Sequence, residues 1–233
     1  EIYPYLEDPL LNEIKALDLR QKDIAQFCCN DGRELLSIAK QGVRSATGFD
    51  IAENTISYAK ATAKDADIPC DFVAANILDI DDRYRNSYDL IIITIGALIW
   101  FEDLTLFFKK VSDCLKPEGL VIIHELHPFT NILGCEGEEG FDPADPTKLI
   151  HPYFFKGPRT SDQGIAYLSE SHYPSKVLTD FVHTFEDILS AMITNQLTLM
   201  KLKEYDVDIS ELFNSLSHKA LPLSTLIIGK KTV

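Results

Sequence analysis

The residues most suited to chemistry lie between Asp23 and Asp50, in the stretch DIAQFCCNDGRELLSIAKQGVRSATGFD. It reads as an apolar strand, a tight loop with Gly32, an amphipathic helix and a second strand that ends in an acid. This order is typical of a nucleotide-binding βαβ unit. Asp50 closes the second strand, where a carboxylate can accept both hydroxyls of a ribose. We therefore expect a ligand that contains a ribose.

The loop of this unit argues against a ligand held by its phosphates. Cys28 and Asn30 stand where a dinucleotide fingerprint has glycines, and only Gly32 remains. Asp31 occupies the expected N-cap position, with Glu34 three residues later as the other half of a capping box. A carboxylate there competes for the amides and the helix dipole that would bind phosphate. The loop can still turn, because Asn tolerates the left-handed conformation and Cys is small.

Several segments together resemble the class I S-adenosylmethionine-dependent methyltransferases: the loop at residues 28–32, the GFD ending, and the later segments YDLIIITIGALIWFEDL and LKPEGLVIIHELHP. The resemblance covers residues 23–128 and is thinner elsewhere. It implies S-adenosylmethionine as cofactor and a methyltransferase activity. The sequence departs from the family pattern at Gln26, because the family has an acid near the end of the first strand.

The resemblance also implies where the cofactor is held. After the third strand, the Asn76 amide oxygen can accept from the adenine amino group while the Ile77 amide donates to the ring, although Asn76 could instead only shape a turn. Backbone carbonyls after the fourth strand can hold the cofactor's ammonium group. The expected cofactor-binding residues are Phe27, Cys28, Cys29, Asn30, Gly32, Asp50, Ile51, Asn76, Ile77, Thr94 and Ile95.

Glu125 and His127, which follow the fifth strand in HELHP, are the expected acid–base residues. Methyl transfer is an in-line displacement, so a base is needed only if the acceptor arrives protonated. The alternative is that this pair only anchors a cap by hydrogen bonds. Trp100 and Tyr153 are the expected substrate contacts. No metal site is expected, because His124 should point to the opposite face of its strand from Glu125.

The elements that position these residues alternate between strands and helices. Strands are predicted at 24–28, 45–49, 70–74, 88–94 and 119–125, and helices at 10–19, 32–40, 53–64 and 104–115. Alternation predicts an α/β fold with a mostly parallel, doubly wound sheet whose strands end at one ligand-binding edge. Segments 199–205 and 223–229 predict an antiparallel finish, similar to the family's Rossmann-like seven-stranded sheet.

The pattern breaks at residues 129–180, which carry many Pro and Gly residues and no sustained helical period. We expect a cap inserted after the fifth strand of a single domain spanning 1–233. The stretches HPYFFKGP and GIAYLSESHYPSKV are candidates for short antiparallel strands. Thr184 and Asp187 form a second capping box, opening a helix that runs to about Asn195.

Composition limits the partners. The formal net charge of −14 opposes binding to nucleic acid and to anionic membranes. The five cysteines lack the spacing of a disulfide framework or a CxxC metal site, which favours a reducing, cytoplasmic setting. No apolar stretch is long enough to span a membrane. The sequence therefore favours a small-molecule acceptor and leaves a homodimer open.

Two other functions remain as alternatives. The altered glycine loop and the missing acid at Gln26 are compatible with a catalytically inactive S-adenosylmethionine- or nucleoside-binding protein. An NAD-dependent reductase is disfavoured by Asp31 and by the lack of a Tyr-x-x-x-Lys signature.

Overall fold

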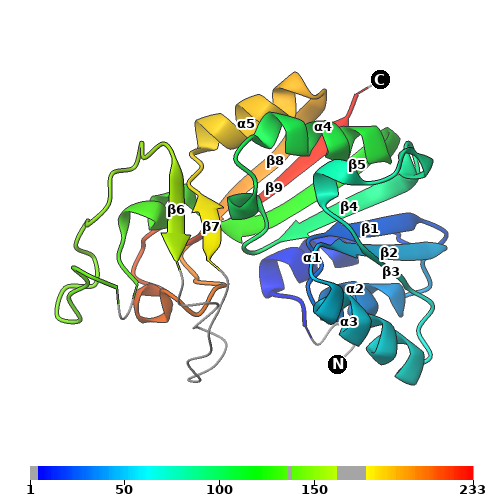
Figure 1. Ribbon diagram of the computed structural model, residues 1–233, viewed down its shortest axis with the longest axis horizontal. Helices are drawn as coiled ribbons and strands as arrows, with labels where there is room; N and C mark the ends of the chain where they lie inside the picture. The colour runs from blue at the N-terminus through cyan, green and yellow to red at the C-terminus, as the bar shows by residue number, and fades with distance from the viewer. Residues whose placement is uncertain (1–4, 136–137, 162–176, 233) are drawn as a thin grey trace.

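The computed structural model describes residues 5–135, 138–161 and 177–232. A seven-stranded sheet runs through the molecule in the order β3-β2-β1-β4-β5-β9-β8. Strands β1 to β5 are parallel, and β9 lies antiparallel between β5 and β8 (Figure 1). The Rossmann-like, mostly parallel sheet and its antiparallel finish are confirmed. The strands are β1 (Asp23–Phe27), β2 (Ser45–Asp50), β3 (Asp71–Ala74), β4 (Tyr88–Thr94), β5 (Leu115–Leu126), β8 (Leu197–Tyr205) and β9 (Ser224–Lys231).

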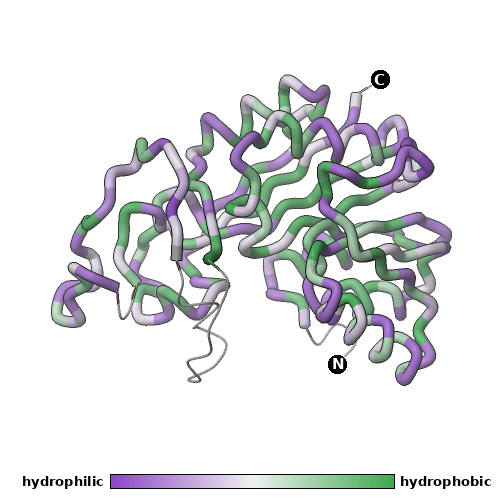
Figure 2. The backbone as a smooth tube through the Cα atoms, viewed as in Figure 1, coloured by the Kyte–Doolittle hydropathy of each residue, from purple (hydrophilic) through white to green (hydrophobic). Residues whose placement is uncertain are grey.

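Helices cover both faces of this sheet (Figure 1). Those on one face are α1 (Asp8–Ala16), α2 (Arg33–Ala39) and α3 (Glu53–Asp65), and those on the other are α4 (Leu104–Cys114) and α5 (Phe185–Thr194). Strand alternation divides the core, because Phe27 of β1 packs on the α4–α5 side and Ile24 on the α1–α3 side. The central strands are correspondingly apolar along their length (Figure 2).

The cap lies beside the carboxyl ends of the parallel strands, on the left of Figure 1. It contains the antiparallel strands β6 (Pro158–Ser161) and β7 (Leu178–Phe181) and the short turns η4 (Pro128–Ile132) and η6 (Asn214–Leu216). Its small core consists of Leu133, Phe213, Leu216 and Leu223. The cap is therefore built from two segments, since residues 206–223 join the expected insertion after β5.

The expected cap strands are displaced along the chain. The stretch HPYFFKGP is mostly turn, and strand β6 begins only at its last residue, Pro158. The stretch GIAYLSESHYPSKV lies almost wholly outside the described residues, and β7 follows it.

The two predicted capping boxes have opposite outcomes. At α5, the Thr184 hydroxyl accepts from the Asp187 amide and the Asp187 carboxylate accepts from the Thr184 amide, as expected. At α2, the prediction is wrong, because the N-cap is Gly32 and not Asp31. Asp31 lies one residue too early and pairs with Arg33, while the Glu34 side chain turns into the protein. The long-range hydrogen bonds of Glu34 to Gln26 and Thr94 thus take the place of the expected capping box.

Candidate active site

The loop between β1 and α2 turns through left-handed residues at alternate positions. The φ angles are 57° at Cys28, 48° at Asn30 and 75° at Gly32. Gly32 has a second reason to be glycine, because a Cβ there would lie 2.4 Å from the Phe72 ring. The loop thus keeps, as expected, the tight turn that glycines usually supply, with Cys and Asn in the other two places.

Asp50 ties this loop to the end of β2. One carboxylate oxygen accepts from the Asn30 amide at 2.9 Å, and the other accepts from the Ala52 amide at 2.9 Å. Each carboxylate oxygen can accept more than one hydrogen bond. Asp50 is only half-buried, so its remaining acceptor positions can serve a ligand's hydroxyl groups.

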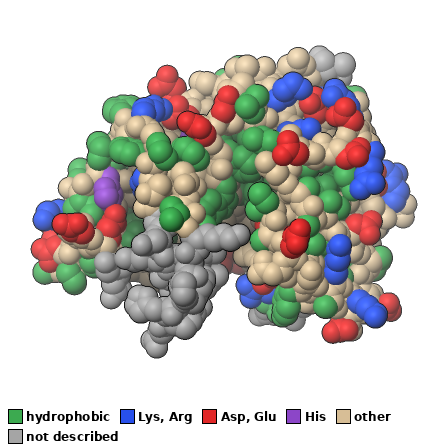
Figure 3. Space-filling view, in the orientation of Figure 1, with side chains coloured by type: hydrophobic (Ala, Val, Ile, Leu, Met, Phe, Trp, Pro, Cys, Tyr) green, Lys and Arg blue, Asp and Glu red, His purple; other side chains and the backbone are tan. Residues whose placement is uncertain are grey.

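Apolar side chains are exposed along the same edge. Ile51 after β2, Ile95 after β4 and Trp100 in η3 (Leu98–Trp100) are 71%, 37% and 41% exposed. Single exposed apolar residues are normal, but three that follow strands β2 and β4 at one edge of the sheet are compatible with a ligand or partner surface. Figure 3 shows the surface hollowed between the cap and the sheet, with apolar side chains in the hollow.

Asn76 makes the contacts expected of a residue that shapes a turn. Its side-chain oxygen accepts from the Leu78 amide at 3.1 Å, and its nitrogen donates to Asp79 at 3.1 Å, which caps the turn η1 (Ile77–Asp79). The oxygen retains one acceptor position for a ligand. The Ile77 side chain is buried in the core, so only its backbone can meet a ligand. As the first residue of η1, Ile77 has an amide with no acceptor inside the turn.

Glu34, which the sequence assigned to a capping box, joins Gln26 and Thr94 beneath the loop. Its Oε2 accepts from Gln26 Nε2 at 2.6 Å and from Thr94 Oγ1 at 2.7 Å. A carboxylate therefore stands beside Gln26, where the family pattern has its acid. Sequence reasoning missed this contact, and its only signal was an amide inside an apolar strand.

Glu125 is an anchor of the loop after β4. Its carboxylate accepts from the amides of Gly96, Ala97 and Leu98 at 2.7–3.0 Å and from the Leu126 amide at 3.3 Å. Burial raises the pKa of this carboxyl group, and the four amides oppose that effect. Because the amides occupy both oxygens of a buried group, the expected role as a general base is not supported. The carboxylate instead shapes the turn that exposes Trp100.

His127 makes hydrogen bonds of the kind expected if it anchors the cap. Its Nδ1 accepts from the Phe129 amide at 2.9 Å, so Nε2 carries the proton and donates to Glu204 of β8 at 2.8 Å. The ring also packs edge-on against Phe185. Burial lowers the pKa of His127. Because both ring nitrogens are hydrogen-bonded within the protein, these contacts favour the anchoring alternative, and the acid–base role of His127 stays a prediction.

Trp100 and Tyr153, the expected substrate contacts, come from different segments. Trp100 lies at the sheet edge, whereas the half-buried Tyr153 lies in the cap with its ring edge-on to Phe154. Phe27 and Cys29 are buried, so their side chains serve the core while their backbone forms the start of the loop.

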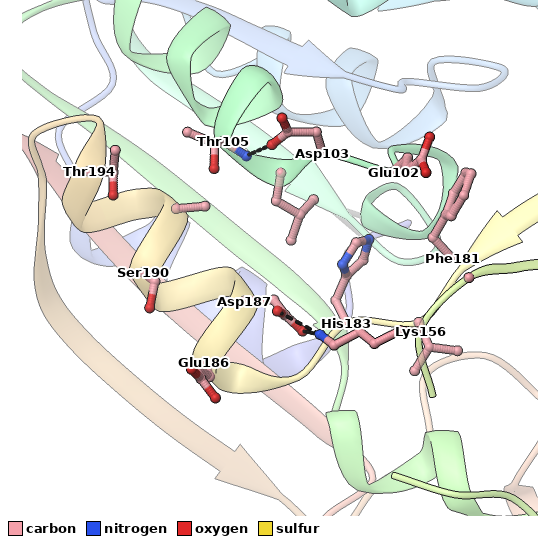
Figure 4. A pocket seen from close by; sticks show the side chains of 14 residues that line it. Glu102, Asp103, Thr105, Lys156, Phe181, His183, Glu186, Asp187, Ser190 and Thr194 are labelled. Atoms are coloured by element: carbon pink, nitrogen blue, oxygen red, sulfur yellow. Dashed lines mark hydrogen bonds and ion pairs between the residues drawn. The ribbon is translucent and has the colours of Figure 1, made fainter. Parts of the chain in front are cut away.

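A groove of about 470 Å³ opens between the cap and the helices α4 and α5 (Figure 4). His183 points toward it, and its Nε2 donates to the Phe101 carbonyl at 2.9 Å. The carboxylates of Asp103 and Asp187 cap the two helices, and Lys156 pairs with Asp187 at 2.9 Å. None of the expected cofactor residues lines it. This groove is therefore separate from the candidate cofactor edge.

Comparisons with known proteins agree with this geometry. The family model for a methyltransferase domain matches residues 24–119. An S-adenosylmethionine-dependent methyltransferase from Mesorhizobium loti is 19% identical with a TM-score of 0.73, covering 99% of this chain and 100% of that chain. One from Methanosarcina mazei is 15% identical with a TM-score of 0.68, covering 98% and 99%.

A third similar structure contains a cofactor product. The magnesium protoporphyrin IX methyltransferase of Synechocystis, solved with bound S-adenosylhomocysteine, is 13% identical with a TM-score of 0.60, covering 97% of this chain and 81% of that chain. At these identities the structures share the fold. A search of curated proteins found no match. Within the described residues, no helix is long and apolar enough to span a bilayer.

Proposed function

Because this chain carries the methyltransferase domain and is a class I S-adenosylmethionine-dependent methyltransferase, we propose that it transfers the methyl group to a small-molecule acceptor. The observation that carries the proposal is the hydrogen bond from Asn30 to Asp50, which joins a left-handed loop to a strand-end carboxylate at the edge where ligands bind.

The residues at this edge fit the cofactor. Asp50 offers acceptor positions to ribose hydroxyls, and exposed Ile51 offers an apolar surface to the base. The Ile77 amide and the remaining Asn76 acceptor position are suited to the polar edge of adenine. The backbone of residues 28–32 and 94–95 completes the set of proposed contacts. When bound, the cofactor supplies an electrophilic methyl group on a sulfonium.

We propose that the chain's own contribution is alignment and exclusion of water. Glu125 fixes the loop after β4, and His127 fixes the start of the cap through Glu204. These two residues are positioning residues in this proposal. Trp100 and Tyr153 would border the acceptor, with the cap selecting it.

The net charge supports a small-molecule acceptor, and the free cysteines support a cytoplasmic location. The net charge of −14 disfavours nucleic acid acceptors. All five cysteines are free, which supports a reducing, cytoplasmic compartment. The described contacts offer no observation that favours the catalytically inactive alternative.

Binding and turnover test the proposal together. Calorimetry should show binding of S-adenosylhomocysteine and none of NAD, and Asp50→Ala should weaken binding by about 1.5–3 kcal/mol, the range for hydrogen bonds to a charged group. Equal binding by wild type and variant would remove Asp50 from the site. A panel of small molecules with methyl-labelled cofactor should then show label transfer, and its absence with intact binding would favour the inactive alternative.

A further inference from the structure

Gln26, Glu34 and Thr94 form a compact polar group, here called the acceptor cluster, at the carboxyl ends of β1 and β4. Gln26 Nε2 donates to Glu34 Oε2 at 2.6 Å and to Thr94 Oγ1 at 3.0 Å, and Thr94 Oγ1 donates to Glu34 Oε2 at 2.7 Å. All side-chain donors of the cluster are therefore used within it.

The cluster has acceptors left over. Gln26 is 1% exposed, and its side-chain oxygen is buried without a hydrogen-bond partner. Both side-chain hydrogen bonds to the Glu34 carboxylate end on Oε2, so Oε1 also remains available, and the Glu34 side chain is only half-buried. An unpaired buried acceptor is costly, so a ligand bearing several donors would be stabilised here.

The charge of the cluster is also uncompensated within the described residues. Asp23 and Glu13, two other partly buried carboxylates, each pair with lysine. Glu34 has no such partner, and the adjacent Arg33 turns outward to Asp31 and to the Tyr5 ring. Burial raises the pKa of Glu34. A cationic donor would supply both the missing hydrogen bonds and the missing charge.

We propose that Glu34, oriented by Gln26 and Thr94, recognises the ammonium group of the cofactor's methionine portion. The inference rests on the proposed function. An ammonium brings three donors and one positive charge, which matches the open acceptors of the cluster. In this chain the carboxylate comes from helix α2, and strand β1 supplies the amide that orients it. Glu34 is thus a specificity residue for the cofactor. It supplies the carboxylate that the family pattern places near the end of the first strand and that this chain lacks at Gln26.

The competing account is that the cluster only fastens α2 to the sheet. Two ligands distinguish the accounts: S-adenosylhomocysteine, and its deaminated analogue, which keeps the nucleoside, the sulfur and the carboxylate but lacks the amino group. A fastening role would change the affinity for both ligands equally. Ammonium recognition would change only the affinity for S-adenosylhomocysteine.

The experiment measures both dissociation constants by calorimetry on the full chain. Glu34→Gln should weaken S-adenosylhomocysteine binding by about tenfold to a hundredfold, as for a lost hydrogen bond to a charged group, and leave the analogue unchanged. The exchange Gln26→Glu with Glu34→Gln returns a carboxylate to the cluster and should restore most of the preference. Glu7→Gln removes an exposed carboxylate near Glu34 and serves as the matched control, with no change in preference.

Each outcome of this experiment supports or overturns the proposed role of Glu34. Equal losses for both ligands, or no loss in Glu34→Gln, would overturn the inference while leaving the proposed function intact. Failure of wild type to bind S-adenosylhomocysteine would overturn the proposed function and this inference with it. If Glu34→Gln does not fold by circular dichroism, the exchange variant decides alone, since loss of its preference would overturn the inference and retention would support it.

Discussion

The sheet and the cap meet at the candidate site but are built differently. The sheet separates two extended cores, and its buried polar groups are tied to the backbone, as Glu125 is to three consecutive amides. The cap packs around only Leu133, Phe213, Leu216 and Leu223, and it borders exposed ion pairs such as Lys156 with Asp187. Small cores supply little stability. The comparison predicts that the cap unfolds locally at a lower free energy than the sheet.

The largest expected effect lies in the sheet. Glu125→Gln replaces one carboxylate oxygen by an amide nitrogen that faces backbone amides, so the free energy of unfolding should fall by about 3–5 kcal/mol through two lost charged hydrogen bonds. Denaturant unfolding measures this. Glu118→Gln makes the same change at an exposed site on the same strand and should cost less than about 1 kcal/mol. If Glu125→Gln lost turnover without losing stability, Glu125 would return to the mechanism as a base.

In the cap, Leu216→Ala should open a cavity in the small core and cost about 2–3 kcal/mol. The loss should appear in hydrogen exchange of cap amides, while the unfolding midpoint of the sheet and the affinity for S-adenosylhomocysteine stay unchanged. Leu212→Ala, at a half-buried position beside the same core, should have a smaller effect. A matching fall in sheet stability would show that the two halves unfold together and would break the comparison.

Acid should also weaken the sheet through His124. Burial lowers the pKa of His124 to about 4, and its Nε2 is buried without a partner. Between about pH 6.5 and about pH 4 the unfolded chain therefore binds a proton at this residue that the folded chain does not, so stability is lost as the pH falls. This amounts to about 2 kcal/mol by about pH 5. His124→Gln should flatten the pH dependence of unfolding by that amount, and an unchanged slope would contradict the prediction.

The smallest expected effect is at the border of the cap. Lys156→Met removes the ion pair with Asp187, but the lysine side chain is 65% exposed, so the free energy of unfolding should fall by less than about 1 kcal/mol. Lys148→Met, at an exposed cap lysine with no ion pair among the described residues, is the control. A loss of several kcal/mol at Lys156 alone would mean that the cap depends on this contact more than on its core.

The sequence predicted the parts of the molecule that local patterns determine. Apolar runs located the seven strands of the main sheet within about two residues, except that β5 starts earlier, at Leu115, and the strand order placed Asp50 at the carboxyl edge. The two short cap strands were not located in this way. The Thr184 capping box was predictable because both partners lie within one turn.

Long-range contacts were not predictable in this way. Glu34 satisfies the local capping pattern, yet its carboxylate binds Thr94, which is far away in the sequence. His127 follows β5 as expected, whereas Glu125 is still part of the strand, and their partners lie on the β4 loop and on β8, so these contacts could be seen only in the fold. Residues 206–223 lack a periodic pattern and gave no signal that they belong to the cap.

The points where the cap leaves the sheet have a practical consequence. Leu126 lies opposite Ser224, Ser224 lies opposite Tyr205, and the His127 amide donates to the Leu223 carbonyl at 2.9 Å. Three of the four ends of the two cap segments thus lie on neighbouring strands at one corner of the sheet, and the fourth leads from β7 into α5. Recombination boundaries at this corner, with one more between β7 and α5, would exchange the cap and leave the loops after β1 and β2 untouched. Under the proposal that the cap selects the acceptor, such chimaeras would change acceptor specificity and keep the cofactor affinity.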